Sequence, residues 1–107
     1  MEYFIYQLKL LPKYRVQANW TEQTQQIIST HFNYLKKHCD EGKVLLAGRT
    51  GLSIEDDNNA GICIFRAESL EAAGDFMNND PAVVNGVMTA RVFPFSLAML
   101  NTTVSVE

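Results

Sequence analysis

Residues 44–67 have the sequence VLLAGRTGLSIEDDNNAGICIFRA, in which two apolar stretches lie on either side of a polar tip. The first stretch predicts a β-strand that we expect to continue past Gly51 and Leu52. Residues 55–59 are acidic and amidic, a composition typical of turns. The second stretch, Gly61–Ala67, is rich in β-branched and aromatic residues and predicts another strand. The segment is therefore expected to form a β-hairpin in the middle of the chain.

An apolar strand is predicted near the amino terminus, before this hairpin. Tyr3–Leu11 is aromatic and β-branched and stops at Pro12. Its polar residues are Gln7 and Lys9, which are two positions apart and therefore share one face of the strand. The opposite face is expected to be buried. Residues 13–20 then predict an irregular connection.

A long amphipathic helix is predicted to follow this connection. Thr21 is a suitable N-cap, but Thr24 stands where a Glu or Gln would complete a capping box, so we expect no full box. Glu41-Gly42 is expected to end the helix, because glycine favours the left-handed cap. One stripe of the helix carries apolar and imidazole side chains at three- and four-residue spacing: Ile27, Ile28, His31, Leu35 and His38.

A second helix and a last strand are predicted after the hairpin. Ser69 is a suitable N-cap for a helix that ends near Asn79, and Asp80-Pro81 predicts one further helical turn. Val87–Phe95 predicts the last strand. The resulting order, strand-helix-hairpin-helix-strand, is that of a ferredoxin-like α+β sandwich. Both helices would cover one face of a four-stranded antiparallel sheet. The other face would remain apolar, so we expect it to pack against a second copy of the chain.

Length and composition indicate one globular domain. The chain has 107 residues, of which 47% are hydrophobic and 20% charged. The net charge is −3 with both signs interspersed, so nucleic-acid binding is not expected. No stretch approaches the roughly 20 apolar residues of a membrane helix, and Glu2 stands where a signal peptide would be basic. Two reduced thiols at Cys39 and Cys63 in a cytoplasmic protein are favoured over a disulfide, which stays an open alternative.

Motifs for common cofactors and nucleophiles are missing from the sequence. It contains no GxGxxG, P-loop or GxSxG. His31 and His38 are two helical turns apart, about 10 Å, which is too far for adjacent metal ligands. Cys63 has no neighbouring basic residue in the sequence to stabilise a thiolate. We therefore expect no metal, no cofactor and no cysteine nucleophile.

Five residues are candidates for a site, and each also has a structural interpretation. His31 has a side chain suited to acid–base catalysis, or it is a partly buried histidine bonded to backbone. Asp80 is a candidate carboxylate, or simply the N-cap before Pro81. Arg49 and Arg91 lie in predicted strands and would bind an anionic group or point into solvent. Tyr34 would line a pocket or pack in the core.

Several short motifs, taken in order, resemble the YCII-related family of the dimeric α/β-barrel superfamily over about residues 3–95. They are the helix start at Thr21, His31-Phe-Asn-Tyr34-Leu35, Gly42-Lys-Val-Leu-Leu-Ala-Gly48, the strand from Gly61, Ser69-Leu-Glu-Ala-Ala73, Asp80-Pro81, Gly86 and Val92-Phe-Pro94-Phe95. The resemblance implies a ferredoxin-like protomer and a homodimer whose two sheets form a barrel. It also implies a cleft in which His31 and Asp80 form a catalytic dyad.

The resemblance further implies chemistry on small molecules. The family is similar to small lyases and isomerases that act on cyclic, often aromatic, metabolites, including a dehydrochlorinase. The chain differs from the family pattern in its longer 13–20 segment and in residues 97–107, which follow the predicted domain of residues 1–96. This extension is expected to add an edge strand, to contact a partner, to close the cleft or to build an oligomer higher than the dimer, and so bears on substrate size.

Two hypotheses about function follow. In the first, the protein is a cofactor-free lyase or isomerase in which His31 is the base and Asp80 orients it. Arg49 or Arg91 would then anchor an anionic group of the substrate. In the second, the protein is a dimeric ligand-binding or regulatory module that uses the same cleft without chemistry. A hydrogen bond between His31 and Asp80 beside an open cavity would favour the first.

Overall fold

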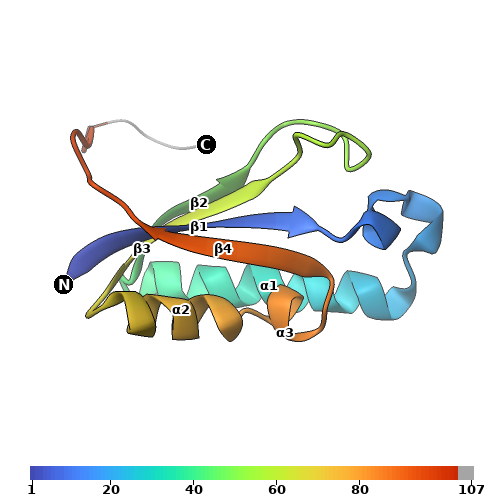
Figure 1. The fold of residues 1–107 in the computed structure, drawn as a ribbon, viewed down its shortest axis with the longest axis horizontal. Coiled ribbons are helices and arrows are strands. Elements are labelled where there is room, and N and C mark those ends of the chain that lie inside the picture. Colours follow the sequence, from blue (N-terminus) through green and yellow to red (C-terminus); the bar gives the residue numbers. More distant parts are fainter. Residues whose placement is uncertain (104–107) are drawn as a thin grey trace.

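Four antiparallel strands in the order β2-β3-β1-β4 form the sheet of the computed structural model, which describes residues 1–103. All three α-helices lie on one face of this sheet (Figure 1). The elements are β1 (Glu2–Leu10), the 3-10 turns η1 (Pro12–Arg15) and η2 (Gln17–Asn19), α1 (Glu22–Asp40), β2 (Val44–Arg49), β3 (Gly61–Ala67), α2 (Leu70–Asn78), α3 (Pro81–Val84) and β4 (Met88–Pro94). This arrangement confirms the predicted ferredoxin-like α+β fold.

The central strand β1 carries the clearest alternation in the molecule. Its even positions from Phe4 to Leu10 are buried under the helices, and its odd positions lie on the outer face of the sheet. On the inner face, Tyr6 pairs with Cys63 of β3 and with Val92 of β4. Tyr6 is therefore at the centre of the sheet, beneath the helical layer, with 0% of its surface exposed.

The start of α1 corrects one prediction. The Thr24 amide donates to the Thr21 hydroxyl, and the Thr24 hydroxyl accepts from the Thr21 amide, each at 3.2 Å. The capping box is thus complete, although Thr24 is neither Glu nor Gln. A hydroxyl is a sufficient acceptor here because Thr24 is buried close against the cap.

The strand β2 is shorter than predicted. It ends at Arg49 rather than continuing past Gly51 and Leu52, which are both exposed. Side chains in the following loop bond to nearby amides: the Ser53 hydroxyl accepts from Glu55, and the Asp56 carboxylate accepts from Asn58. Such local bonds compete with ladder pairing, which explains the early end of the strand.

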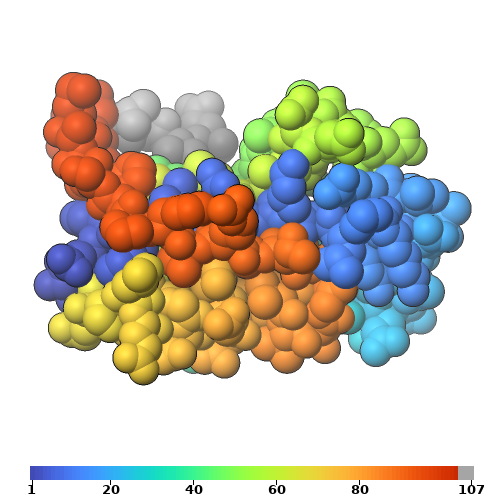
Figure 2. All heavy atoms as spheres, in the orientation of Figure 1, coloured from blue at the N-terminus to red at the C-terminus, as the bar shows by residue number. Residues whose placement is uncertain are grey.

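The loop between β2 and β3 is fixed to the segment that follows β1. The Arg15 guanidinium forms an ion pair with the Asp57 carboxylate at 3.2 Å, and the Lys9 ammonium donates to the Asp57 carbonyl. In Figure 2 this loop, coloured green, rises on the side of the sheet opposite the helices. It therefore borders the outer face of the sheet.

The outer face carries an apolar row that crosses all four strands. Ile5 of β1 pairs with Ile64 of β3 and Phe93 of β4, and Leu46 of β2 pairs with Ile64. Phe93 and Leu46 are both exposed. An apolar row of this length on one face is the feature that the sequence analysis expected a second copy to cover.

The segment after β4 has no strand in its described part, residues 97–103. Residues 104–107, the rest of the extension for which an edge strand or a partner contact was predicted, lie outside the described residues. Within residues 1–103, no helix combines the length and apolar character needed to cross a membrane.

Candidate functional site

Two residues that are 49 positions apart in the sequence meet where α1 packs against α3. The Nδ1 atom of His31, on α1, lies 2.6 Å from Oδ1 of Asp80, at the junction of α2 and α3. The Asp80 side chain is completely buried, whereas 13% of the His31 side chain is exposed. His31 thus sits between a buried carboxylate and the solvent.

The local sequence explains why Asp80 takes this position. Asp80 is the N-cap of α3, with Pro81 at the first helical position. Its Oδ1 atom accepts the Ala82 amide at 2.9 Å, in addition to the bond with His31. The two interpretations left open by the sequence are therefore compatible, because one carboxylate both caps the helix and contacts the imidazole.

The hydrogen-bond partners of Asp80 favour one tautomer of His31. Oδ2 accepts the Tyr6 hydroxyl at 2.8 Å, so the Ala82 amide and the Tyr6 hydroxyl already donate to the carboxylate. An ionised carboxylate only accepts hydrogen bonds, so the bond with His31 requires a proton on Nδ1. In neutral His31, Nε2 then carries the free lone pair.

Nε2 of His31 remains available. Within residues 1–103 it has no hydrogen-bond partner, since the single polar contact of the ring is made through Nδ1. No buried side-chain nitrogen or oxygen in the described chain lacks a partner, so Nε2 must reach solvent. An accessible imidazole lone pair whose opposite nitrogen is held by a carboxylate is the arrangement of a general base.

Tyr6 is the member of this cluster that sequence reasoning missed. Its hydroxyl is buried, and burial is the main cause that raises the pKa of Tyr6 above its ordinary value, so the group stays protonated and donates to Asp80. One signal was present: Tyr6 lies between Phe4 and Leu8 on the buried face of β1, and a buried tyrosine hydroxyl needs a partner. The sequence did not show which partner, because Asp80 is 74 positions away.

Tyr34, a predicted substrate-binding residue, is tied to the helical layer. Its hydroxyl donates to the Phe76 carbonyl at 2.8 Å, and its ring stacks on the Phe76 ring with centroids 5.2 Å apart. Burial raises the pKa of Tyr34 as well. Its hydroxyl therefore has a structural partner, and a role in substrate binding stays a prediction.

The structure does not bring the two candidate arginines to the His31–Asp80 pair. Arg91 lies on the outer face of β4, opposite the helices, with its guanidinium 5.3 Å from the centre of the Phe93 ring. Arg49 ends β2 and lines a surface cavity of about 290 Å³. Both are exposed, and within residues 1–103 neither forms an ion pair. Anion binding by either stays a prediction.

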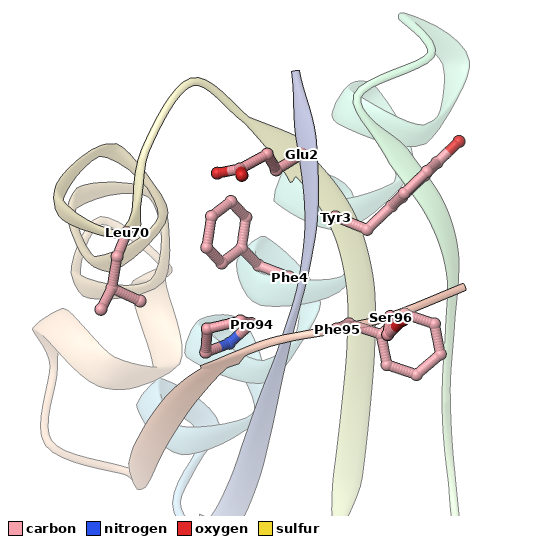
Figure 3. A pocket seen from close by; sticks show the side chains of 7 residues that line it. All are labelled: Glu2, Tyr3, Phe4, Leu70, Pro94, Phe95 and Ser96. Atoms are coloured by element: carbon pink, nitrogen blue, oxygen red, sulfur yellow. The ribbon is translucent and has the colours of Figure 1, made fainter. Parts of the chain in front are cut away.

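A second cavity of about 440 Å³ opens where β1 and β4 approach the start of α2. Figure 3 shows Phe4, Leu70 and Pro94 on its helical side, whereas Tyr3 and Phe95 point to the other side of the strands. Neither cavity is lined by His31 or Asp80. The hydrogen bond that the catalytic hypothesis expected is therefore present, but neither of these two cavities lies beside it.

The thiols and potential metal ligands are arranged as follows. Cys39 and Cys63 are both free, and only Cys39 is exposed. Burial raises the pKa of the Cys63 thiol to about 12, although the neighbouring Tyr6 hydroxyl lowers the pKa in part. Among the side chains of residues 1–103, no three of the His, Cys, Asp and Glu type are grouped as a metal ion would require.

Two solved structures share this fold. The chain is similar to 5-chloro-2-hydroxyhydroquinone dehydrochlorinase from Burkholderia phenoliruptrix AC1100, solved in complex with 2,5-dihydroxybenzoquinone, with a TM-score of 0.65 and 22% identity over 90% of this chain and 95% of that one. It is also similar to muconolactone isomerase, with a TM-score of 0.64 and 17% identity over 98% and 97% of the two chains. No curated protein sequence matches the chain.

A family model covers nearly the whole chain. It matches residues 2–96, from the first residue of β1 to two residues beyond β4, and so includes both His31 and Asp80. The resemblance that the short motifs indicated is thereby confirmed, and it agrees with the observed order of strands and helices. The protein belongs to the YCII-related domain family.

Proposed function

We propose that this protein is a cofactor-independent enzyme that moves a proton, or eliminates a leaving group, on a small cyclic or aromatic metabolite. His31 is the general base and Asp80 orients it. The observation that carries the proposal is the 2.6 Å contact between Nδ1 and the buried carboxylate, which leaves Nε2 unpartnered and open to solvent.

The chemistry follows from this geometry. Nε2 takes a proton from an acidic C–H or O–H group of the substrate, and the resulting imidazolium is stabilised by the ionised Asp80. The electron pair released in the substrate either moves a double bond or expels a leaving group as an anion. In isomerisation the proton returns to another substrate carbon, and in elimination it leaves to solvent. No redox partner is needed for either outcome.

The two structural neighbours support this class of reaction. Their names describe the removal of chloride from a chlorinated hydroquinone and the isomerisation of a lactone, and both substrates are small rings. These names describe those proteins. For this chain they supply the compounds with which a test should begin.

The test compares two histidine variants on three probes. Wild type is incubated with 5-chloro-2-hydroxyhydroquinone, with chloride release as the readout, and with muconolactone, with absorbance as the readout. Binding of 2,5-dihydroxybenzoquinone is measured by calorimetry. His31→Gln is expected to lower turnover about 10²- to 10⁴-fold, the usual contribution of a general base. His38→Gln, on the same helix but without a buried carboxylate partner, should stay within about twofold of wild type.

Other results would favour the binding or regulatory module. If wild type binds 2,5-dihydroxybenzoquinone without turnover of the other two probes, and His31→Gln binds it equally well, the site holds a ligand without chemistry. Turnover that survives in His31→Gln would also remove His31 from the mechanism.

We also propose that two copies of the chain pair through the outer face of the sheet, which the exposed apolar row supports. We further propose that the protein is cytoplasmic and that its two cysteines are reduced, which the two free thiols support. Light scattering should give twice the mass of one chain for wild type. Phe93→Glu, which places a charge on the exposed end of the row, should give one chain mass with an unchanged circular dichroism spectrum. A monomeric wild type would contradict the pairing.

A further inference from the structure

We propose that Tyr6 is a positioning residue, whose hydroxyl holds the Asp80 carboxylate in the orientation that directs Oδ1 at His31. The inference rests on the proposed role of His31 and Asp80, and assigns a third residue to the same site. Tyr6 does not touch the imidazole, because its hydroxyl contacts one oxygen of the Asp80 carboxylate and His31 contacts the other.

The two oxygens of the Asp80 carboxylate bind different partners. Oδ1 accepts from His31 at 2.6 Å and from the Ala82 amide at 2.9 Å, while Oδ2 accepts from Tyr6 at 2.8 Å. Among the described residues, the Tyr6 hydroxyl is the only hydrogen-bond donor to Oδ2. Rotation of the carboxylate about its own axis would therefore break the Tyr6 bond. The hydroxyl opposes this rotation from the side away from His31.

Packing alone does not explain a tyrosine at this position. The ring of Tyr6 packs against Phe65 and Phe76, with centroids 5.5 and 6.1 Å apart, and a phenylalanine ring would make the same contacts. The other buried positions of β1 are Phe4, Leu8 and Leu10, which carry no polar atom in their side chains. Burying a hydroxyl has a desolvation cost, and here the bond to Asp80 offsets it.

The electrostatic surroundings give the hydroxyl a second role. The groups that face Asp80 are Tyr6, Tyr34, Cys63 and His31. Burial raises the pKa of the first three, so each stays neutral near pH 7 and none supplies a positive charge. Apart from His31, the buried negative charge is therefore supported by two hydrogen bonds, from Ala82 and from Tyr6.

The test uses ¹⁵N NMR of the imidazole rings in the complete, ligand-free protein. Wild-type His31 is expected to show one tautomer, with the proton on Nδ1. Tyr6→Phe should give a mixture of tautomers and at least about tenfold faster exchange of the Nδ1 proton with water. Tyr34→Phe is the matched control, because it also removes a tyrosine hydroxyl that is hydrogen-bonded in the helical layer, but one that is half-buried and donates to the Phe76 carbonyl. Its His31 signals should match wild type.

A second measurement keeps the test decisive if Tyr6→Phe does not fold. Tyr34→Phe protein labelled with 3-fluorotyrosine has a more acidic phenol at Tyr6 and none at residue 34, which should strengthen the bond to Asp80 and shift the His31 Nδ1 resonance. Tyr6→Phe, or fluorotyrosine labelling, that leaves the His31 signals unchanged would overturn the role of Tyr6 alone. A wild-type His31 ring with no preferred tautomer would instead refute the dyad, and with it the proposed function.

Discussion

Helix α1 carries two histidines, two turns apart on one stripe, whose surroundings differ in every respect that matters for chemistry. His31 contacts a completely buried carboxylate at 2.6 Å. His38 contacts Glu41 at 3.7 Å, and 52% of the Glu41 side chain is exposed. The His38 ring also packs edge-on against Tyr34 and Phe76. The same residue type is thus a candidate base at one position and a packing residue at the other.

The difference between them lies in the partner rather than in the histidine. Asp80 is held in place by its bond to the Ala82 amide as the N-cap of α3, by its bond to Tyr6 and by complete burial. Its position is therefore fixed in the ligand-free protein. Glu41 is exposed and lies in the same helical end as His38, so both side chains can move apart into water at little cost. A histidine has one defined tautomer when the carboxylate that it contacts is fixed in place, as Asp80 is.

The largest expected difference is in stability. Asp80→Ala should lower the free energy of unfolding by about 3–5 kcal/mol, because it leaves buried donors unpaired and removes the cap of α3. Glu41→Ala should change it by less than about 0.5 kcal/mol, since the group is exposed. Urea unfolding at pH 7 measures both values. Equal losses in the two variants would mean that the two histidines do not differ as the structure indicates.

Alkaline pH tests the core beneath His31. The pKa of Cys63 is raised by burial from 9.0 to about 12, so above pH 9 the unfolded chain loses this proton while the folded chain keeps it. Unfolding then becomes easier as pH rises, by up to about 1.4 kcal/mol per pH unit for one group. Between pH 9 and 10, Cys63→Ala should show a smaller slope than wild type in urea unfolding.

Cys39, beside His38, is the matched control for this slope. Because its thiol is exposed in the folded chain, Cys39→Ala should leave the slope unchanged. A slope that depends on Cys39 rather than on Cys63 would mean that the region near His38 is the more desolvated of the two.

The smallest expected effect is that of the charge on Glu41. At low salt, Glu41→Gln should lower the free energy of unfolding by at most about 0.5 kcal/mol, because the pair with His38 is exposed on the Glu41 side. In 0.5 M NaCl this difference should vanish, because exposed pairs are screened. A larger change in the free energy of unfolding that persists in 0.5 M NaCl would mean that the His38–Glu41 ion pair is buried from solvent.

Much of the architecture was predictable, because it depends on patterns that are local in the chain. The alternation in β1, the caps at Thr21, Ser69 and Asp80, and the order of strands and helices are all readable within a few residues. The two corrections involve contacts of single hydroxyls and amides. Thr24 completes a capping box, and side chains of the 50–60 loop end β2 early, which residue propensities do not resolve.

The site also combines features that local sequence patterns predict with features that depend on tertiary contacts. The sequence by itself determined that His31 lies on the apolar stripe of α1 and that Asp80 caps the turn that begins at Pro81, because both follow from helix periodicity and capping chemistry. Only the tertiary structure decided that the two meet at 2.6 Å and that Tyr6 binds the other carboxylate oxygen. These partners are 49 and 74 positions from Asp80 along the chain. Contacts across such separations arise from the packing of helices onto a sheet, which no local pattern records.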